Sequence, residues 1–201
     1  ISTGHHQMTD ISGYVPLWSG ALDAHHLEKL IDKNLNKNAW YPHGIPAAAQ
    51  KQTGRFAESP RVLMFWNALI GEGLLDAGRR DLAVDLTMRL MDAIKVNFLR
   101  FCDFQEVLHA ETGEPIGERG NLKGLAPRRL FLHCLGVQYV QASHLFLDGR
   151  NDFPWPVTVK YKGVTLTRHK TDTVITFATG QTMTVSGNEP KEILLTDQPH
   201  Q

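Results

Sequence analysis

The chain has 201 residues, of which 42% are hydrophobic and 21% charged, and its 21 basic and 21 acidic side chains give a formal net charge of zero. A chain without net positive charge does not attract polyanions, which argues against nucleic acid as the main partner. No apolar stretch approaches the ~20 residues that a membrane-spanning helix needs. The hydrophobic content and the absence of net charge also exclude a disordered chain.

The start of the chain and its cysteines say little about where the protein works. Residues 1–4 read Ile-Ser-Thr-Gly, without an initiator Met or a signal segment. We therefore expect that an upstream segment was removed or that the chain is a piece of a longer protein. The localisation stays open, with the cytoplasm slightly favoured. Cys102 and Cys134 form no C-x-x-C pair, which predicts two buried free thiols.

Two patterns of hydrophobic residues meet near residue 150. Apolar residues recur at helical spacing before this point and alternate after it. Pro154 and Pro156 follow directly, and proline cannot continue a helix. We therefore predict an α+β fold, with a helical domain over residues 1–150 and a small antiparallel β domain over residues 151–201.

The first domain is predicted to contain a helical hairpin. A helix over residues 20–35 comes first. Ser59-Pro60 then reads as a helix start, and Gly78 as its end in the left-handed conformation. Asp81 is expected to cap the next helix, which runs to about residue 101. The inner face of this helix is predicted to carry apolar residues at helical spacing, namely Ala83, Leu86, Leu90, Ile94 and Phe98. Because the connection is so short, the two helices should form an antiparallel αα-hairpin.

Two long loops separate the predicted helices. They cover residues 36–58 and 102–123, and a last helix is expected to start at Pro127. Loops of this length inside a compact domain usually carry function.

The tail is predicted to form an antiparallel meander. Apolar residues alternate over residues 157–161 and 164–168, and two further runs follow at 174–177 and 183–185, with turn residues between them. Residues 193–195 are expected to close the sheet.

Three motifs carry a resemblance to a known family. Residues 40–46 read Trp-Tyr-Pro-His-Gly-Ile-Pro and resemble the Phe-Trp-x-Pro-x-Gly-Ile-Pro loop of the six-hairpin (α/α)6-barrel glycoside hydrolases. Residues 106–114 read Glu-Val-Leu-His-Ala-Glu-Thr-Gly-Glu and resemble their Glu-Tyr-Tyr-x-Pro-Glu-Thr-Gly-Glu segment. Residues 124–127 and 153–161 resemble the end of the amylo-α-1,6-glucosidase-like branch. The chain is thus similar to this branch and to glycoside hydrolase family 63, over about residues 14–185.

The resemblance implies an (α/α)6 toroid followed by the β domain. Six hairpins of the predicted size, together with that domain, would exceed 201 residues. We therefore expect only the last two or three hairpins here, with the remaining N-terminal hairpins of the parent protein as partners. A severed arc of repeats should leave apolar flanks exposed.

The resemblance also implies hydrolysis of α-linked glucosides or oligosaccharides. Inverting glycosidases use two carboxyl groups ~6.5–9.5 Å apart, one as general acid and one as general base. The resemblance places the base at Glu106, with Asp103 one turn earlier as a rival. The family's acid lies on an earlier hairpin that has no counterpart here. We therefore expect the chain alone to be inactive and to need no cofactor.

Candidate sugar-binding residues lie in the first loop and at the start of the following helix. They are Trp40, Tyr41, His43, Arg61, Trp66 and Asn67. Indole and phenol rings stack on sugar rings while their polar edges stay hydrated, and Arg and Asn side chains can bond hydroxyl groups.

Other kinds of site have little support. His25-His26 and His133-Cys134 are adjacent pairs, whose side chains diverge on a helix, so no metal site is expected. No nucleotide-binding motif occurs. Two alternatives stay open, because fold does not determine chemistry. One is a lyase or epimerase on the same toroid, with His109 or Tyr41 as base. The other is a non-catalytic carbohydrate-binding or scaffolding α+β module.

Overall fold

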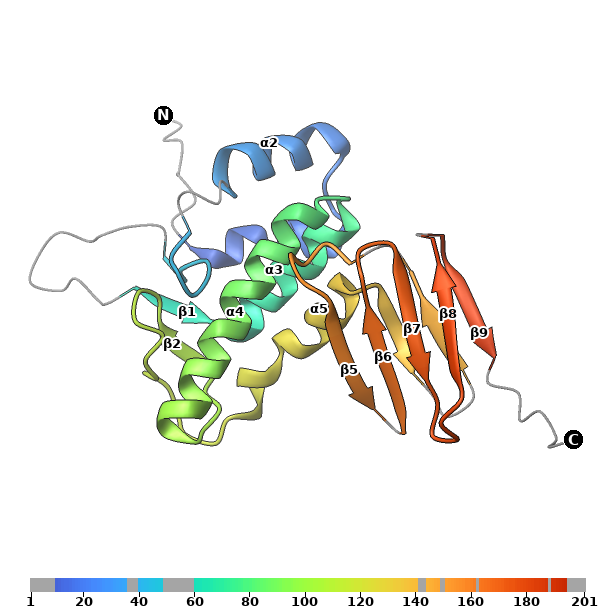
Figure 1. Cartoon of the computed structure of the whole chain (residues 1–201). Helices are drawn as coiled ribbons and strands as arrows, with labels where there is room; N and C mark the ends of the chain where they lie inside the picture. The colour runs from blue at the N-terminus through green and yellow to red at the C-terminus, as the bar shows by residue number, and fades with distance from the viewer. Residues whose placement is uncertain are drawn as a thin grey trace, which may run out of the picture. The chain divides into compact units, whose positions relative to one another are not determined.

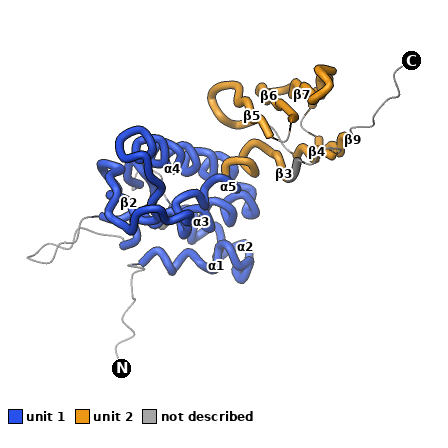
Figure 2. Tube along the Cα trace, turned by 90° about the horizontal axis from the view of Figure 1, so that it is seen from below, with its two compact units in different colours: residues 1–130 blue, residues 131–201 orange. Residues whose placement is uncertain are grey.

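The computed structural model describes residues 10–35, 40–48, 60–140, 144–148, 151–161, 163–187 and 189–194. Contacts within the chain divide it into two units, residues 1–130 and 131–201 (Figure 2). The boundary predicted at residue 150 therefore falls inside the second unit. The fold is α+β, as the two hydrophobic patterns predicted.

The first unit is built on the predicted helical hairpin (Figure 1). It consists of α3 (Met64–Asp76) and α4 (Arg80–Phe101), which pack against each other. Gly78 adopts the left-handed conformation after α3, with a φ of 72°, as predicted. Of the apolar positions expected on the inner face of α4, Leu86 and Leu90 are fully buried, whereas Phe98 is exposed.

The starts of both hairpin helices were predicted wrongly. Residues 61–63 form strand β1 (Arg61–Leu63) instead of the first turn of α3. Pairing with β2 (Val107–His109), a segment distant in sequence, overrides the helix-start signal at Pro60. Ser59 lies outside the described residues. Arg79, and not Asp81, is the N-cap of α4.

Shorter helices precede the hairpin in the chain. The 3-10 turn η1 (Ile11–Tyr14) leads into α1 (Val15–Ser19), which packs on α3. Gly73 permits this approach, because a Cβ there would lie 2.8 Å from the Leu17 side chain. The predicted early helix is α2 (Ala24–Asn34), capped by Asp23, which accepts from the His26 amide at 2.9 Å.

The end of α4 differs from the prediction for Cys102. This residue caps the helix in the left-handed conformation, with a φ of 51°, and it is exposed. Cys134 is buried, as expected. It ends α5 (Pro127–Cys134), the predicted last helix, which follows the 3-10 turn η3 (Leu122–Leu125).

The described residues of the second unit form two antiparallel sheets. The predicted meander is confirmed as β5 (Val157–Tyr161), β6 (Val164–Arg168), β7 (Asp172–Thr176) and β8 (Thr182–Ser186). A second sheet has the strand order β3-β4-β9, from β3 (Val137–Val140), β4 (His144–Leu147) and β9 (Lys191–Leu194).

Two predictions about this unit were wrong. Residues 137–140 and 144–147 were assigned to the helical half but form β3 and β4. The segment around Ile193 does not close the meander, because it pairs with Leu145 of β4. Leu145 of one sheet and Ile175 of the other are fully buried. Among the described residues, no helix is long and apolar enough to cross a membrane.

Candidate functional site

Residues 40–46 and 106–114, the two segments of the first unit that carry the family resemblance, lie next to each other in the structure. Strand β1 lies between them: Pro46 forms a bridge with Val62, and Leu108 of β2 lies opposite Val62 on the other side. The Ala47 amide donates to Arg61 O at 2.7 Å, and the His43 amide donates to Ala110 O at 3.2 Å. Main-chain hydrogen bonds thus join residues 40–48 to the segment that follows Glu106.

Strands β1 and β2 form a two-stranded ribbon. Glu106 lies where this ribbon meets the α3–α4 hairpin. Its carbonyl accepts from the amide of Met64, the first residue of α3, at 2.9 Å. The ribbon itself connects the start of α3 to the end of α4, so Glu106 lies at the end of the hairpin opposite its turn.

The Glu106 carboxylate is held on one oxygen only. Asn121 Nδ2 donates to Oε2 at 3.1 Å, and Lys123 Nζ lies 3.5 Å from the same oxygen. Oε1 accepts no hydrogen bond from the described residues, and the side chain is 23% exposed. One oxygen is therefore positioned and the other is available to a water molecule.

Asp103, the rival carboxylate, has both oxygens engaged. Oδ1 accepts from the amides of Phe104 and Gly120 at 2.8 and 2.9 Å, and Oδ2 lies 3.3 Å from Arg119 Nε and 3.4 Å from Gln105 Nε2. The Gly120 amide makes the largest contribution to lowering the pKa of Asp103. Its carboxylate thus ties residues 119–120 to the end of α4, which is a structural task.

Asn67 holds the 40–48 segment in place. Its Oδ1 accepts from the Ile45 amide at 2.8 Å, and its Nδ2 donates to Ile45 O and Leu63 O at 2.9 and 3.1 Å. The side chain is completely buried. Gly44 passes close by, and a Cβ there would lie 2.9 Å from Asn67 Oδ1. Asn67 therefore positions the loop and has no exposed atom for a sugar hydroxyl.

Trp40 and Tyr41 are attached to α4 through Arg89. The Arg89 guanidinium lies 5.8 Å from the centre of the Trp40 ring, and Nη1 donates to Tyr41 O at 2.8 Å. Asp85 holds Nε of the same guanidinium at 3.0 Å. Trp40 is 7% exposed, and its indole N–H finds no partner among the described residues. The side chain of Tyr41 is half-buried.

His43 is buried against the second loop. Its Nδ1 lies 4.0 Å from Asp92 Oδ2, and a Cβ on Gly113 would lie 2.8 Å from its Nε2. Burial of the imidazole lowers the pKa of His43; the Asp92 carboxylate raises it, and His109 lowers it further. The imidazole is therefore neutral at pH 7.

The remaining predicted side chains lie on or near the ribbon. Arg61 is exposed and lies opposite His109 in the β1–β2 register. Trp66 is half-buried in the first turn of α3. The Nδ1 atom of His109 lies 3.2 Å from the Glu111 amide and 3.3 Å from the Thr112 amide, so this nitrogen is occupied by its own turn.

Sequence reasoning missed the residues that hold the carboxylate of Glu106. Asn121 caps η3, because its Oδ1 accepts from the Lys123 amide at 3.1 Å. An Asn before a short helix is a recognisable capping signal. The contact with Glu106, fifteen residues earlier, has no local sequence signal.

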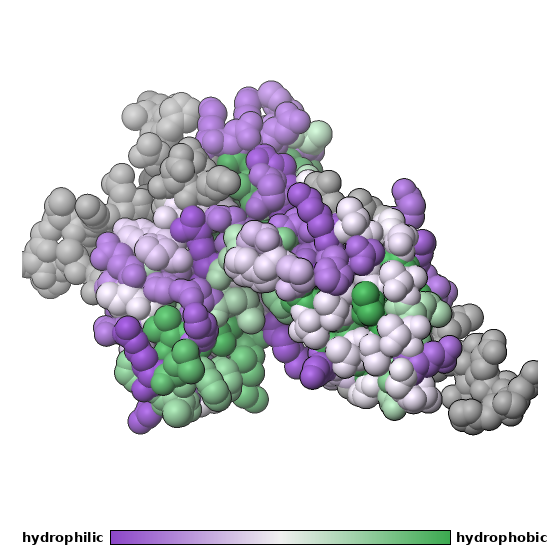
Figure 3. All heavy atoms as spheres, in the orientation of Figure 1, coloured by the Kyte–Doolittle hydropathy of each residue, from purple (hydrophilic) through white to green (hydrophobic). Residues whose placement is uncertain are grey.

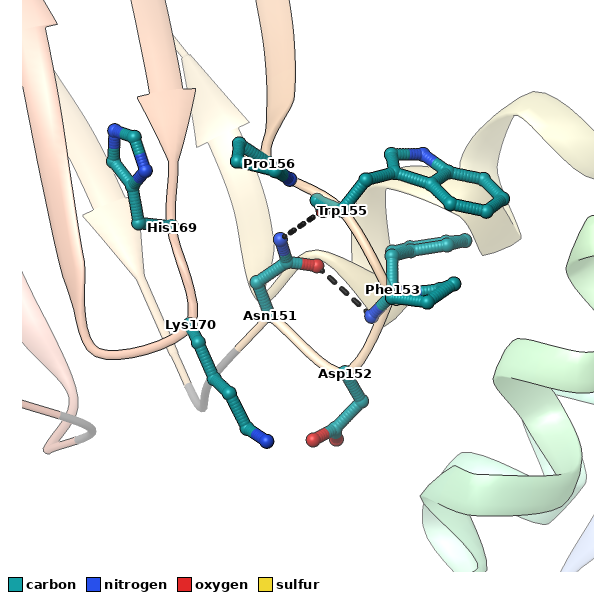
Figure 4. A pocket seen from close by; sticks show the side chains of 8 residues that line it. Asn151, Asp152, Phe153, Trp155, Pro156, His169 and Lys170 are labelled. Carbon is teal, nitrogen blue, oxygen red and sulfur yellow. Dashed lines mark hydrogen bonds between the residues drawn. The ribbon is translucent and has the colours of Figure 1, made fainter.

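The second unit has a pocket of about 360 Å³ beside β6. Asn151 organises it, donating to Trp155 O and Arg168 O and accepting from the Phe153 amide, each at 3.0 Å. Figure 4 shows the Asp152 and Lys170 side chains directed toward one another, while the Trp155 indole points away from His169. The indole and the polar side chains therefore do not converge on one ligand position.

Within the described ranges, no three His, Cys, Asp or Glu side chains converge in a way that could hold a metal ion.

No protein-family model and no curated protein matches the chain. Among solved structures, it is similar to the glycoside hydrolase family 63 mannosylglycerate hydrolase from Thermus thermophilus in complex with glucose, with a TM-score of 0.50 and 21% identity over 62% of this chain. The same hydrolase in complex with Tris gives the same three values. The matches cover 31% and 29% of those chains, so this chain spans under a third of their length. Its fold is like that of glycoside hydrolase family 63.

Proposed function

We propose that this chain is the C-terminal part of an inverting glycosidase that hydrolyses α-linked glucosides or oligosaccharides. Glu106 is the general base, and the general acid lies outside the chain. The environment of the Glu106 carboxylate carries the proposal. It is partly exposed, with one oxygen held by Asn121 and Lys123 and the other available.

The proposed step follows from that geometry. A water molecule hydrogen-bonded to Glu106 Oε1 attacks the anomeric carbon and gives its proton to this oxygen. The bond between the anomeric carbon and the leaving oxygen breaks, and that oxygen takes a proton from the acid on the opposite side. Asp103 does not compete for this role, because both of its carboxylate oxygens already accept hydrogen bonds. Oδ1 accepts from the amides of Phe104 and Gly120, and Oδ2 accepts from Arg119 Nε.

The loop and ribbon supply the sugar contacts in this proposal. Tyr41, Arg61 and Trp66 keep exposed or half-buried side chains near the ribbon. Trp40, His43 and Asn67 are buried, and they act by holding residues 40–48 in place. A half-buried aromatic side chain and an exposed guanidinium suit a polyol with apolar ring faces.

The rest of the toroid is the proposed partner. The first unit would supply its last hairpins, of which α3–α4 is the best defined. The second unit, including β3 and β4, would supply the terminal β domain. Phe98, Leu99 and Phe101 are exposed at the end of α4. Figure 3 shows apolar side chains gathered at the lower left of the view, where α4 ends in Figure 1. A missing hairpin packed on such a surface would bury it.

The test is Glu106→Gln in the complete polypeptide that carries this chain, with hydrolysis of α-glucosides and α-linked oligosaccharides as the readout. We expect turnover to fall by at least ~10²-fold, because the base is lost. The matched control is Glu111→Gln, which changes an exposed carboxylate of the next turn. Proton NMR of the first product should show the β-anomer.

Three outcomes would overturn the proposal. Unchanged hydrolysis in Glu106→Gln would favour a non-catalytic carbohydrate-binding or scaffolding role. An unsaturated or epimerised product would indicate the lyase or epimerase alternative. An α-anomeric first product would exclude the inverting mechanism.

A further inference from the structure

The turn that follows the Glu-Thr-Gly-Glu segment contacts both carboxylates of the candidate site. Arg119 and Gly120 bind Asp103, and Asn121 and Lys123 bind Glu106. Side-chain and main-chain contacts from residues 119, 120, 121 and 123 thus link one short turn to the segment that carries the proposed base.

Asn121 is fixed at three points. Its amide donates to Phe104 O at 3.1 Å, its Oδ1 accepts from the Lys123 amide at 3.1 Å, and its Nδ2 donates to Glu106 Oε2 at 3.1 Å. Because the first two bonds set the direction of the side chain, Nδ2 is aimed at Oε2. The Asp103 bond to Gly120 then fixes the turn itself.

We infer that Asn121 and Lys123 are positioning residues for the general base. This inference rests on the proposed function of Glu106. By occupying Oε2 they turn Oε1 toward the site where the attacking water must lie. A carboxylate held by one oxygen cannot exchange its two oxygens freely, so a single lone-pair direction is presented to the water.

The two residues do not contribute equally. The half-buried side chain of Asn121 donates a hydrogen bond to the Glu106 carboxylate. The Lys123 side chain is 65% exposed, and its 3.5 Å contact is weakened by solvent and salt. Asn121 is therefore the main positioning residue, and Lys123 has the smaller effect.

Asn121→Asp is the most informative variant. It keeps the oxygen that caps η3, and it replaces the donor to Glu106 by a carboxylate that repels it. We expect kcat to fall by roughly tenfold or more while KM changes little, as for a lost hydrogen bond to a charged group. Asn121→Ala should lower kcat by about tenfold, and Lys123→Met by about threefold or less. Lys95→Met is the control, because Lys95 forms a comparable exposed ion pair with Asp92 at 3.7 Å.

A double-mutant cycle in the complete polypeptide separates positioning from a general structural role. The Asn121 changes are repeated in the Glu106→Gln background, using an activated glycosyl fluoride to detect the residual hydrolysis. We expect no further loss of kcat there, because Asn121 acts through Glu106. The same loss in both backgrounds, or unchanged kcat in Asn121→Asp alone, would overturn the inference. Unchanged hydrolysis in Glu106→Gln alone would instead overturn the proposed function.

Discussion

Residues 40–48 of the first unit and residues 151–156 of the second are both loops organised by a buried asparagine. Asn67 makes three hydrogen bonds to the main chain of Ile45 and Leu63, and Asn151 makes three to Phe153, Trp155 and Arg168. The tryptophans of the two loops nevertheless differ, since Trp40 is 7% exposed and Trp155 is 57% exposed. An asparagine anchor determines the path of the main chain but not whether the aromatic side chain of the loop is accessible.

This difference changes which residues can act on a ligand. A tryptophan in a Gly- and Pro-rich loop reads from sequence as a platform for a sugar. In the first unit, Arg89 covers that ring and α4 holds the loop. The first loop therefore supports the candidate site mainly through its backbone, and the function proposed above assigns the chemistry to Glu106.

Alanine substitution of the two tryptophans should show the difference between the two loops most clearly. Trp40→Ala removes a buried ring and should lower the free energy of unfolding by about 3–5 kcal/mol. Trp155→Ala removes an exposed ring and should change it by about 0.5 kcal/mol or less. Chemical denaturation followed by circular dichroism measures both. Similar losses in the two variants would contradict the assigned burial.

Substitution of the two asparagine anchors should have separate local effects. Asn67→Ala removes the side-chain partner of the amide and carbonyl of Ile45, and should lower the free energy of unfolding by about 3 kcal/mol. Asn151→Ala should lower the free energy of unfolding by about 2 kcal/mol. This loss is smaller because the bond from Asn151 to Trp155 O is only partly buried. Hydrogen exchange should show faster exchange around residue 45 in the first variant and around residue 153 in the second. Equal loss of protection across both units in either variant would contradict separate anchors.

His43 should make the first loop sensitive to acid. Its pKa is lowered by burial in the folded state, whereas the unfolded side chain titrates near 6.5. Below that pH the unfolded state binds more protons, so stability must fall as the pH decreases. The Tm should therefore drop between pH 7 and pH 5, with a shallower drop in His43→Gln. Parallel Tm curves for the two proteins would show that His43 does not cause the acid sensitivity.

Local signals predicted the elements that depend on neighbouring residues. The spacing of Leu86 and Leu90 and the glycine at Gly78 identified the α3–α4 hairpin, and alternation identified the β5–β8 meander. Strands β1 and β2 escaped prediction because they pair across more than forty residues, as Val62 and Leu108 illustrate. Such pairing is decided by tertiary contacts, which override a short proline signal.

The candidate site was predictable to a similar extent. Motif resemblance singled out Glu106 and the 40–46 loop, and the structure brings their segments together through β1. The motif resemblance could not show that the Asn67 side chain is bonded to the main chain of Ile45 and Leu63. Nor could it show that Asp103 is engaged on both oxygens while Glu106 is engaged on one. These distinctions depend on the turn at residues 119–123, whose contacts are set by the fold.

The most direct measurement is a crystal structure of the complete polypeptide with a bound α-linked disaccharide. We predict a water between Glu106 Oε1 and the anomeric carbon, with a second carboxyl group ~6.5–9.5 Å away on the opposite face of the sugar. A saccharide bound elsewhere, with Glu106 pointing into bulk solvent, would contradict it.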